Sequence, residues 1–187
     1  MNREDLEHII RAAADVTNEY EFIIVGSQSI LGAIPYPPEV FKMSAEADIY
    51  PRDAEDKSTM IDGALGEGSQ FHTTYGFYAQ GVDSQTAKLP LGWEGRLHRV
   101  QNAGTNGRLG LCLDTIDLFM SKTAANREKD RVFNMALLQH GYVLAADAIQ
   151  MVDAMYFLSD ADKKNMRARI RRWVKQLREQ GYDVPSG

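Results

Sequence analysis

Hydrophobic and polar positions along the first part of the chain alternate between helical spacing and strand spacing. Residues 3–18 predict an amphipathic helix, and the side chains on its apolar face are Leu6, Ile9, Ile10, Ala13 and Val16. A short apolar run at 21–25 then predicts a buried strand, which ends on Gly26. The segment after it, up to Pro35, predicts a second helix that begins at Ser27.

The run MSAEADIYP, residues 43–51, predicts a second strand that follows a proline-rich loop. Successive side chains of a strand point to opposite faces, so Glu46 and Asp48 share one face while small and apolar residues occupy the other. Two adjacent carboxylates repel each other and weaken their strand. This pattern therefore raises the question of which cation lies between them.

The rest of the chain is predicted to be rich in strands in the middle and helical at the end. The expected elements are a helix over 52–66, strands over 71–82, 95–101 and 108–113, and helices over 117–140, 146–158 and 160–180. We expect an α/β (α+β) fold with a domain at 1–142. A helical C-terminal extension at 143–187 is expected to pack on the same unit.

Composition indicates an ordinary soluble globular protein, with 44% hydrophobic and 25% charged residues. No apolar run approaches the ~20 residues of a membrane span, and the N-terminus does not resemble a secretory signal. The single cysteine, Cys112, lies in an apolar run and is predicted to be a buried, inert thiol. One cysteine forms no internal disulfide, which favours a cytoplasmic location, and the short apolar runs favour no membrane partner.

Charge is distributed unevenly along the chain. Residues 163–187 contain eight of the 21 Lys and Arg and two acids, which leaves 13 cations and 24 carboxylates, a net of −11, before them. The basic C-terminal helix is therefore expected either to bind RNA, including tRNA, or a partner protein, or to remain solvated and balance the acidic body.

The glycine and serine that follow the first strand, Gly26 and Ser27, suggest a place for an anion, because a helix N-terminus has unpaired N–H groups. The alternative is a simple helix N-cap. Glu46 and Asp48 suggest a Mg²⁺ site, and the alternative is a solvated strand. An anion cradle followed by metal-binding acids predicts a site for Mg²⁺ and a nucleoside triphosphate.

Two motifs resemble a known superfamily, the polymerase-beta-like nucleotidyltransferases. The first is Val25-Gly26-Ser27 followed by Glu46-Ala47-Asp48-Ile49. The second lies in residues 114–133 and resembles a segment of the bacterial nucleotidyltransferase-like proteins related to the abortive-infection nucleotidyltransferase toxins. Its matching positions are Asp117, Leu118, Lys122, Ala125, Arg127, Lys129 and Asp130. The resemblance covers about residues 20–140 and implies a mixed sheet flanked by helices.

The resemblance implies that the second motif contributes to nucleotide binding through Lys122, Arg127, Lys129 and Asp130. On one continuous helix, Lys122, Asn126 and Lys129 would share a face, and the two ammonium groups would bind phosphates or neutralise carboxylates. The alternative is a solvated helix face. Asp130 is expected to orient a lysine or to pair with Arg127.

The chain departs from the superfamily pattern in its acids. Glu46 stands where the pattern usually has Asp, and the third carboxylate, expected as a base on a neighbouring strand, has only Asp83 as a candidate. Asp83 is also typical of a turn residue. Two hypotheses follow: a nucleotidyltransferase with an RNA or protein acceptor, or a degenerate binding module, antitoxin-like or regulatory.

Overall fold

The computed structural model of the protein describes residues 1–185 and divides into two compact units. Unit 1 contains Met1–Ala87 and Arg96–Asp114, and unit 2 contains Lys88–Gly95 and the chain from Thr115 onward. The division at 114 and 115 differs from the boundary at 142 and 143 that the sequence suggested. Compact units need not coincide with functional domains, so the predicted domains 1–142 and 143–187 stay a prediction.

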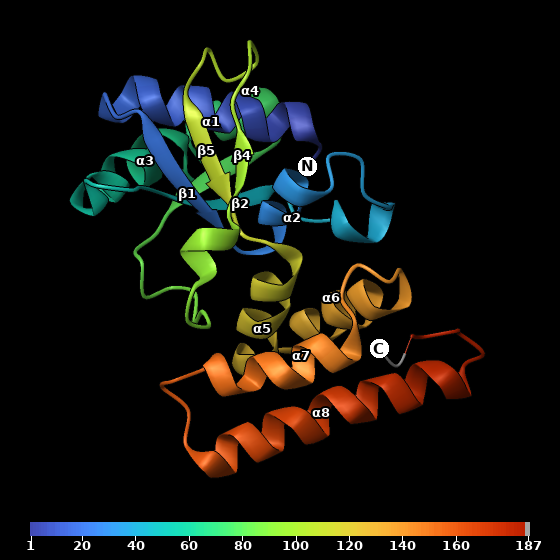
Figure 1. Ribbon diagram of the computed structural model, residues 1–187. Coiled ribbons are helices and arrows are strands. Elements are labelled where there is room, and N and C mark those ends of the chain that lie inside the picture. Colours follow the sequence, from blue (N-terminus) through green and yellow to red (C-terminus); the bar gives the residue numbers. More distant parts are fainter. Residues whose placement is uncertain (186–187) are drawn as a thin grey trace. The chain divides into compact units, whose positions relative to one another are not determined.

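Unit 1 is built on a five-stranded mixed sheet in the order β3-β2-β1-β5-β4 (Figure 1). The strands are β1 Glu21–Val25, β2 Glu46–Pro51, β3 Tyr78–Gly81, β4 His98–Val100 and β5 Leu109–Cys112. Strand β1 runs antiparallel to β2 and parallel to β5, β2 runs parallel to β3, and β4 runs antiparallel to β5. The expected α/β fold with a mixed sheet is confirmed.

Unit 1 also contains helices, and two of them pack closely on one face of this sheet. The helices are α1 Arg3–Thr17, α2 Ile30–Ala33, α3 Ser58–Leu65 and α4 Gln70–Tyr75. A Cβ on Gly32 of α2 would lie 2.2 Å from Cys112 Cβ, and one on Gly81 would lie 1.9 Å from the Ser58 carbonyl oxygen. The strand register places Cys112 and Gly81 on the same face of the sheet. Helices α2 and α3 therefore cover the face opposite to the two acids of β2.

Cys112 is fully buried in this interface, as the sequence predicted. Burial raises the pKa of its thiol to about 12, because an ionised sulfur loses its hydration there. The thiol is therefore protonated at neutral pH, which agrees with the prediction of an inert side chain.

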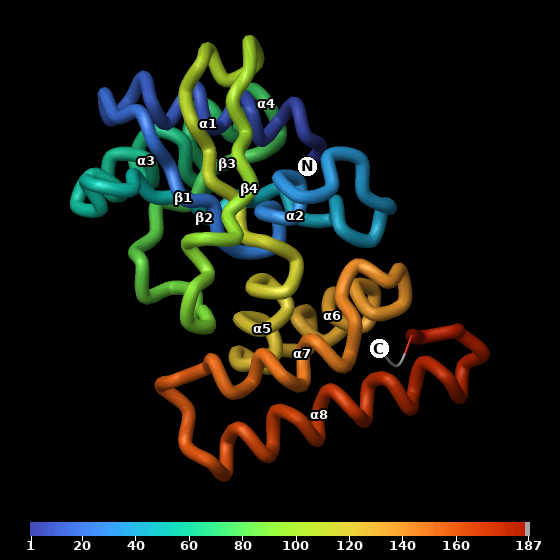
Figure 2. Tube along the Cα trace, in the orientation of Figure 1, coloured from blue at the N-terminus to red at the C-terminus, as the bar shows by residue number. Residues whose placement is uncertain are grey.

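Unit 2 is helical. Its helices are α5 Thr115–Ala125, α6 Glu128–Gln139, α7 Ala145–Met151 and α8 Asp160–Glu179. Helices α7 and α8 lie side by side (Figure 2). The apolar stripe of α8 is buried and consists of Met166, Ile170, Trp173, Val174 and Leu177. Within the described residues, no helix is both long enough and apolar enough to span a membrane.

One predicted strand is wrong in its first half. Residues 71–75 belong to α4, and the strand β3 begins only at Tyr78. The Ser69 hydroxyl caps the helix by accepting a hydrogen bond from the His72 amide, at 3.1 Å. Gly76 then ends the helix with a left-handed φ of 78°. These two caps outweigh the strand preference of the aromatic and β-branched side chains between them.

The predicted long helix over 117–140 is two helices, α5 and α6. The break is at Asn126, whose φ of 56° is left-handed and ends the helical path. The Asp130 carboxylate accepts from the Arg127 amide at 3.4 Å and so supports the start of α6. Lys122 and Lys129 therefore lie on different helices, and the single cationic face expected from helical spacing is wrong.

Candidate functional site

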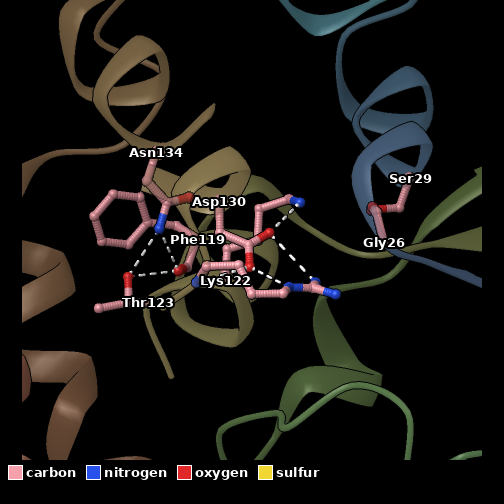
Figure 3. Close-up of polar contacts among 8 residues, drawn as sticks. Gly26, Ser29, Phe119, Lys122, Thr123, Asp130 and Asn134 are labelled. Atoms are coloured by element: carbon pink, nitrogen blue, oxygen red, sulfur yellow. Dashed lines mark hydrogen bonds and ion pairs between the residues drawn. The ribbon is translucent and has the colours of Figure 1, made fainter. Parts of the chain in front are cut away.

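The end of β1 forms a tight corner at Gly26. This residue has φ 67° and ψ −168°, a backbone conformation that essentially only glycine adopts. The Gly26 carbonyl oxygen accepts hydrogen bonds from the Ser29 amide at 3.2 Å and the Ser29 hydroxyl at 2.8 Å (Figure 3). The helix expected from Ser27 begins as a 3-10 turn, Ser27–Ser29, and α2 itself has only four residues. The helical segment predicted from Ser27 therefore begins at the expected residue, but its first turn is a 3-10 turn and its α-helical part is short.

Asp48 of β2 lies directly against this corner. Strand pairing places Asp48 opposite Val25, the residue before Gly26. A Cβ at position 26 would lie 2.0 Å from Asp48 Oδ2, so glycine is the residue that leaves room for this carboxylate. The fold therefore brings together Gly26 and Asp48, which are 22 positions apart in the sequence.

Glu46 lies two residues before Asp48, on the same face of β2, and both side chains are half-buried. The Tyr78 hydroxyl, from the neighbouring strand β3, donates a hydrogen bond to Glu46 Oε2 at 2.9 Å. Burial and this hydrogen bond raise the pKa of the Tyr78 phenol to about 12. The tyrosine ring in turn contacts the His72 ring, with centroids 4.7 Å apart. Tyr78 thus holds one of the two carboxylates in a fixed orientation.

The candidate third acid, Asp83, lies just after β3. Asp83 is exposed in a turn, where its Oδ1 accepts from the Gln85 amide and the Thr86 hydroxyl, both at 3.0 Å. The position of β3 that pairs with Asp48 holds Gln80, which is exposed. Among residues 1–185, no group of three or more His, Cys, Asp or Glu side chains is arranged to hold a metal.

The second motif forms a buried charge cluster in unit 2 (Figure 3). Asp130 is fully buried, and its carboxylate accepts from Lys122 Nζ at 3.1 Å and from Arg127 Nε at 2.7 Å. The predicted pairing of Asp130 with a lysine and with Arg127 is therefore present. The Lys122 ammonium, on a side chain only 7% exposed, also lies 4.6 Å from the centre of the Phe133 ring. Lys129 is exposed.

Burial and pairing shift the ionisation of this cluster in opposite senses. Burial lowers the pKa of Lys122, and the neighbouring Asp130 carboxylate only partly offsets that effect. Burial alone would raise the pKa of Asp130, but hydrogen bonds and charge from Arg127 and Lys122 hold it below its ordinary value. Asp130 therefore stays ionised and compensates the buried ammonium.

Sequence reasoning missed two residues at these sites. Tyr78 gave no signal, because its approach to Glu46 depends on the pairing of β2 with β3. Asn134 is fully buried in α6, and its amide donates to Thr123 Oγ1 at 2.9 Å and to the Phe119 carbonyl oxygen at 3.0 Å. Its position four residues after Asp130 is the only indication that the sequence offered.

Comparison with known families gives the class of the protein. Residues 4–179 match the family described as "Nucleotidyltransferase of unknown function (DUF6036)", and the chain belongs to this family. The match includes both motifs and all of α8. Comparison with the curated proteins and with the solved structures finds no match. The resemblance to the polymerase-beta-like superfamily and to the abortive-infection toxins stays a prediction.

Proposed function

We propose that this protein transfers a nucleotidyl group from a nucleoside triphosphate to a hydroxyl group of an RNA or protein acceptor, with Mg²⁺. The observation that carries the proposal is the contact between Asp48 and Gly26 in a chain of a nucleotidyltransferase family. A carboxylate beside a strand-end glycine suits a metal-bound phosphate, because the backbone there is open to close approach. We propose on the same grounds that the chain is related to the polymerase-beta-like enzymes.

Glu46 and Asp48 fit Mg²⁺ by their chemistry. Magnesium in nucleotide sites is usually bound through one or two carboxylates together with substrate phosphates and waters. Two half-buried carboxylates on one strand face supply that number of protein oxygens. When bound, the metal supplies charge neutralisation at the phosphates and a lower pKa for the attacking hydroxyl. Gly26 and Ser27 would hold the phosphates through their backbone and the serine hydroxyl.

The proposed reaction forms one bond and breaks one bond at the α-phosphorus. The acceptor oxygen attacks this atom, the bond to the β-phosphate oxygen breaks, and pyrophosphate leaves. The hydroxyl proton passes to solvent or to a carboxylate. Glu46, Asp48 and Asp83 are the acids proposed for this chemistry, and Asp83 is the weakest of them because its oxygen already caps a turn.

The second motif has two proposed roles. Arg127 and Lys129 are exposed cations, and exposed cations are accessible to phosphate. Lys122 and Asp130 are buried against each other, so we propose that they support this binding by fixing the start of α6. In this proposal, Lys122 supports the fold together with Asp130 and does not make the direct phosphate contact that helical spacing had suggested.

Calorimetric titration tests the metal and nucleotide site directly. Non-hydrolysable analogues of the four ribonucleoside triphosphates, each with Mg²⁺, are titrated into the wild type, Asp48→Asn and Asp53→Asn. Asp53 is an exposed acid just beyond β2, so it controls for the loss of one charge. Binding of at least one analogue that Asp48→Asn weakens by about tenfold or more, with Asp53→Asn unchanged, supports the proposal. Equal affinity in all three proteins would refute it.

A second function is favoured by Gln80. This amide occupies the position that pairs with Asp48, where a third acid would complete a set of three carboxylates. A relative that has kept the fold without catalysis would bind nucleotide or a partner as an antitoxin-like or regulatory subunit. Incubation with α-³²P-labelled triphosphates and total RNA or protein distinguishes the transferase from the binding module. Covalent label on an acceptor excludes the binding module, whereas nucleotide binding without any transfer supports it.

A further inference from the structure

Helices α7 and α8 border a groove of about 510 Å³ within unit 2. Its apolar part is formed by Ile149 of α7 and Val174 of α8. Its charged part is formed by Arg171, Lys175 and Arg178, with Glu179 as the only acid of the lining. The groove therefore combines an apolar surface with an excess of positive charge.

The cations of the groove form one stripe along α8. Arg171, Lys175 and Arg178 occupy positions i, i+4 and i+7, which lie on the same side of a helix. All three side chains are exposed. Glu179 lies 3.7 Å from Lys175 and balances one of these charges, and Arg178 also donates to the Val184 carbonyl oxygen. A net positive charge still faces the groove along about 10 Å of the helix axis, at 1.5 Å per residue.

We propose that this groove binds an amphipathic helix of a partner protein, with apolar side chains on one face and Asp or Glu beside them. The apolar surface of the groove would contact the apolar side chains of the partner helix. The cationic stripe would attract its Asp or Glu side chains. About two helical turns match the length of the stripe. This docking function goes beyond nucleotide transfer and is independent of it.

An RNA occupant fits the groove less well. Phosphate contacts need cations and are largely indifferent to an apolar surface beneath them. Arg172, on the same helix, is exposed and does not line the groove, yet it would serve an RNA backbone as well as Arg171 does. The pair Arg171 and Arg172 therefore distinguishes the two kinds of occupant.

Fluorescence anisotropy with a designed peptide tests the proposal. The probe is a labelled 14-residue helix with Leu at every third or fourth position and Glu beside each Leu, and its control has the same composition in scrambled order. Both are titrated with the full chain, without nucleotide. The variants are Arg171→Glu, Ile149→Ala and the control Arg172→Glu, with folding checked by circular dichroism.

The ordered peptide should bind, and Arg171→Glu should weaken binding by about tenfold. Ile149→Ala should weaken it by about threefold to tenfold through lost apolar contact, while Arg172→Glu changes it less than about twofold. Equal binding of the scrambled peptide, or equal loss in the two arginine variants, would overturn the proposal. An RNA oligonucleotide that binds more tightly than the peptide, with equal sensitivity to both arginines, would assign the surface to RNA instead.

Discussion

The two motifs of this chain contain similar residue types but place them in opposite environments. In unit 1, Glu46 and Asp48 are half-buried, and the space beside Asp48 Oδ2 is open because residue 26 is a glycine. In unit 2, Asp130 is fully buried and bonded to two cations. A carboxylate in the first setting is suited to a ligand, whereas one in the second is committed to the fold. Sequence motifs alone do not separate these roles.

Removal of the buried carboxylate should have the largest effect on stability. Asp130→Ala leaves the Lys122 ammonium buried without its partner, so unit 2 should lose about 3 kcal/mol. Lys122→Met should lose less, because Asp130 keeps its contact with Arg127. Both tryptophans, Trp93 and Trp173, belong to unit 2, so urea unfolding followed by tryptophan fluorescence measures this unit.

The exposed acid Asp147 of α7 is the matched control, and Asp147→Ala should change the stability of unit 2 by less than about 0.5 kcal/mol. Equal effects of the Asp130 and Asp147 substitutions would show that the buried pair does not stabilise the unit.

Lowering the pH should remove from the wild type the stabilisation that the Asp130 carboxylate provides. The folded-state pKa of Asp130 is lowered, so its stabilisation is complete above the unfolded pKa and is lost as pH falls through the folded pKa. The stability difference between wild type and Asp130→Ala should therefore narrow below about pH 4. Urea unfolding by tryptophan fluorescence between pH 7 and pH 3 checks this. A difference that is constant across the range would contradict it.

In unit 1, Gly26→Ala should destabilise the strand corner by about 2 kcal/mol, because its backbone conformation is essentially restricted to glycine. The new methyl group would also displace Asp48 and weaken binding of Mg²⁺ and triphosphate. The single buried thiol, Cys112, reports opening of unit 1 through its rate of labelling.

Gly63 of α3 provides the control, because a Cβ there meets nothing within 4 Å. Gly63→Ala should leave nucleotide binding unchanged and stabilise the helix by up to about 1 kcal/mol. Unaltered labelling and binding in Gly26→Ala would mean that the corner tolerates a side chain.

Tyr78→Phe should have the smallest effect on stability. It removes the hydrogen bond to Glu46, at a cost of about 1 kcal/mol, and leaves that carboxylate free to rotate. Loss of an orienting partner should weaken Mg²⁺ binding by about tenfold. Tyr75→Phe makes the same change at an exposed ring of the same unit and should alter neither quantity. Calorimetry with Mg²⁺ and a triphosphate analogue compares the two variants.

Much of the fold follows from local sequence patterns. The helix α1 and the strands β1 and β5 were visible as amphipathic or apolar runs, because each buries a continuous apolar surface. The exceptions depend on single residues. Asn126 divides α5 from α6, and Ser69 with Gly76 turns an apparent strand into α4. Periodicity averages over a window, so it cannot register one left-handed residue.

The candidate site was only partly visible for a different reason. Gly26, Glu46 and Asp48 stand in a recognisable order, and that order sufficed to predict a shared corner. Which residue lies beside each acid depends on strand register, which sets Tyr78 next to Glu46 and Gln80 next to Asp48. Burial is equally non-local, so the difference between the exposed Lys129 and the buried Lys122 had no sequence signal.

In the proposed function, Asp48, beside Gly26, binds the metal of a nucleoside triphosphate. A crystal structure with Mn²⁺ in place of Mg²⁺ and a non-hydrolysable triphosphate analogue, located by anomalous scattering, tests it most directly. We expect a manganese peak at about 2.1 Å from an Asp48 carboxylate oxygen, with phosphate oxygens at the Gly26 backbone. A well-occupied metal and nucleotide bound elsewhere, with no contact to Asp48, would contradict it.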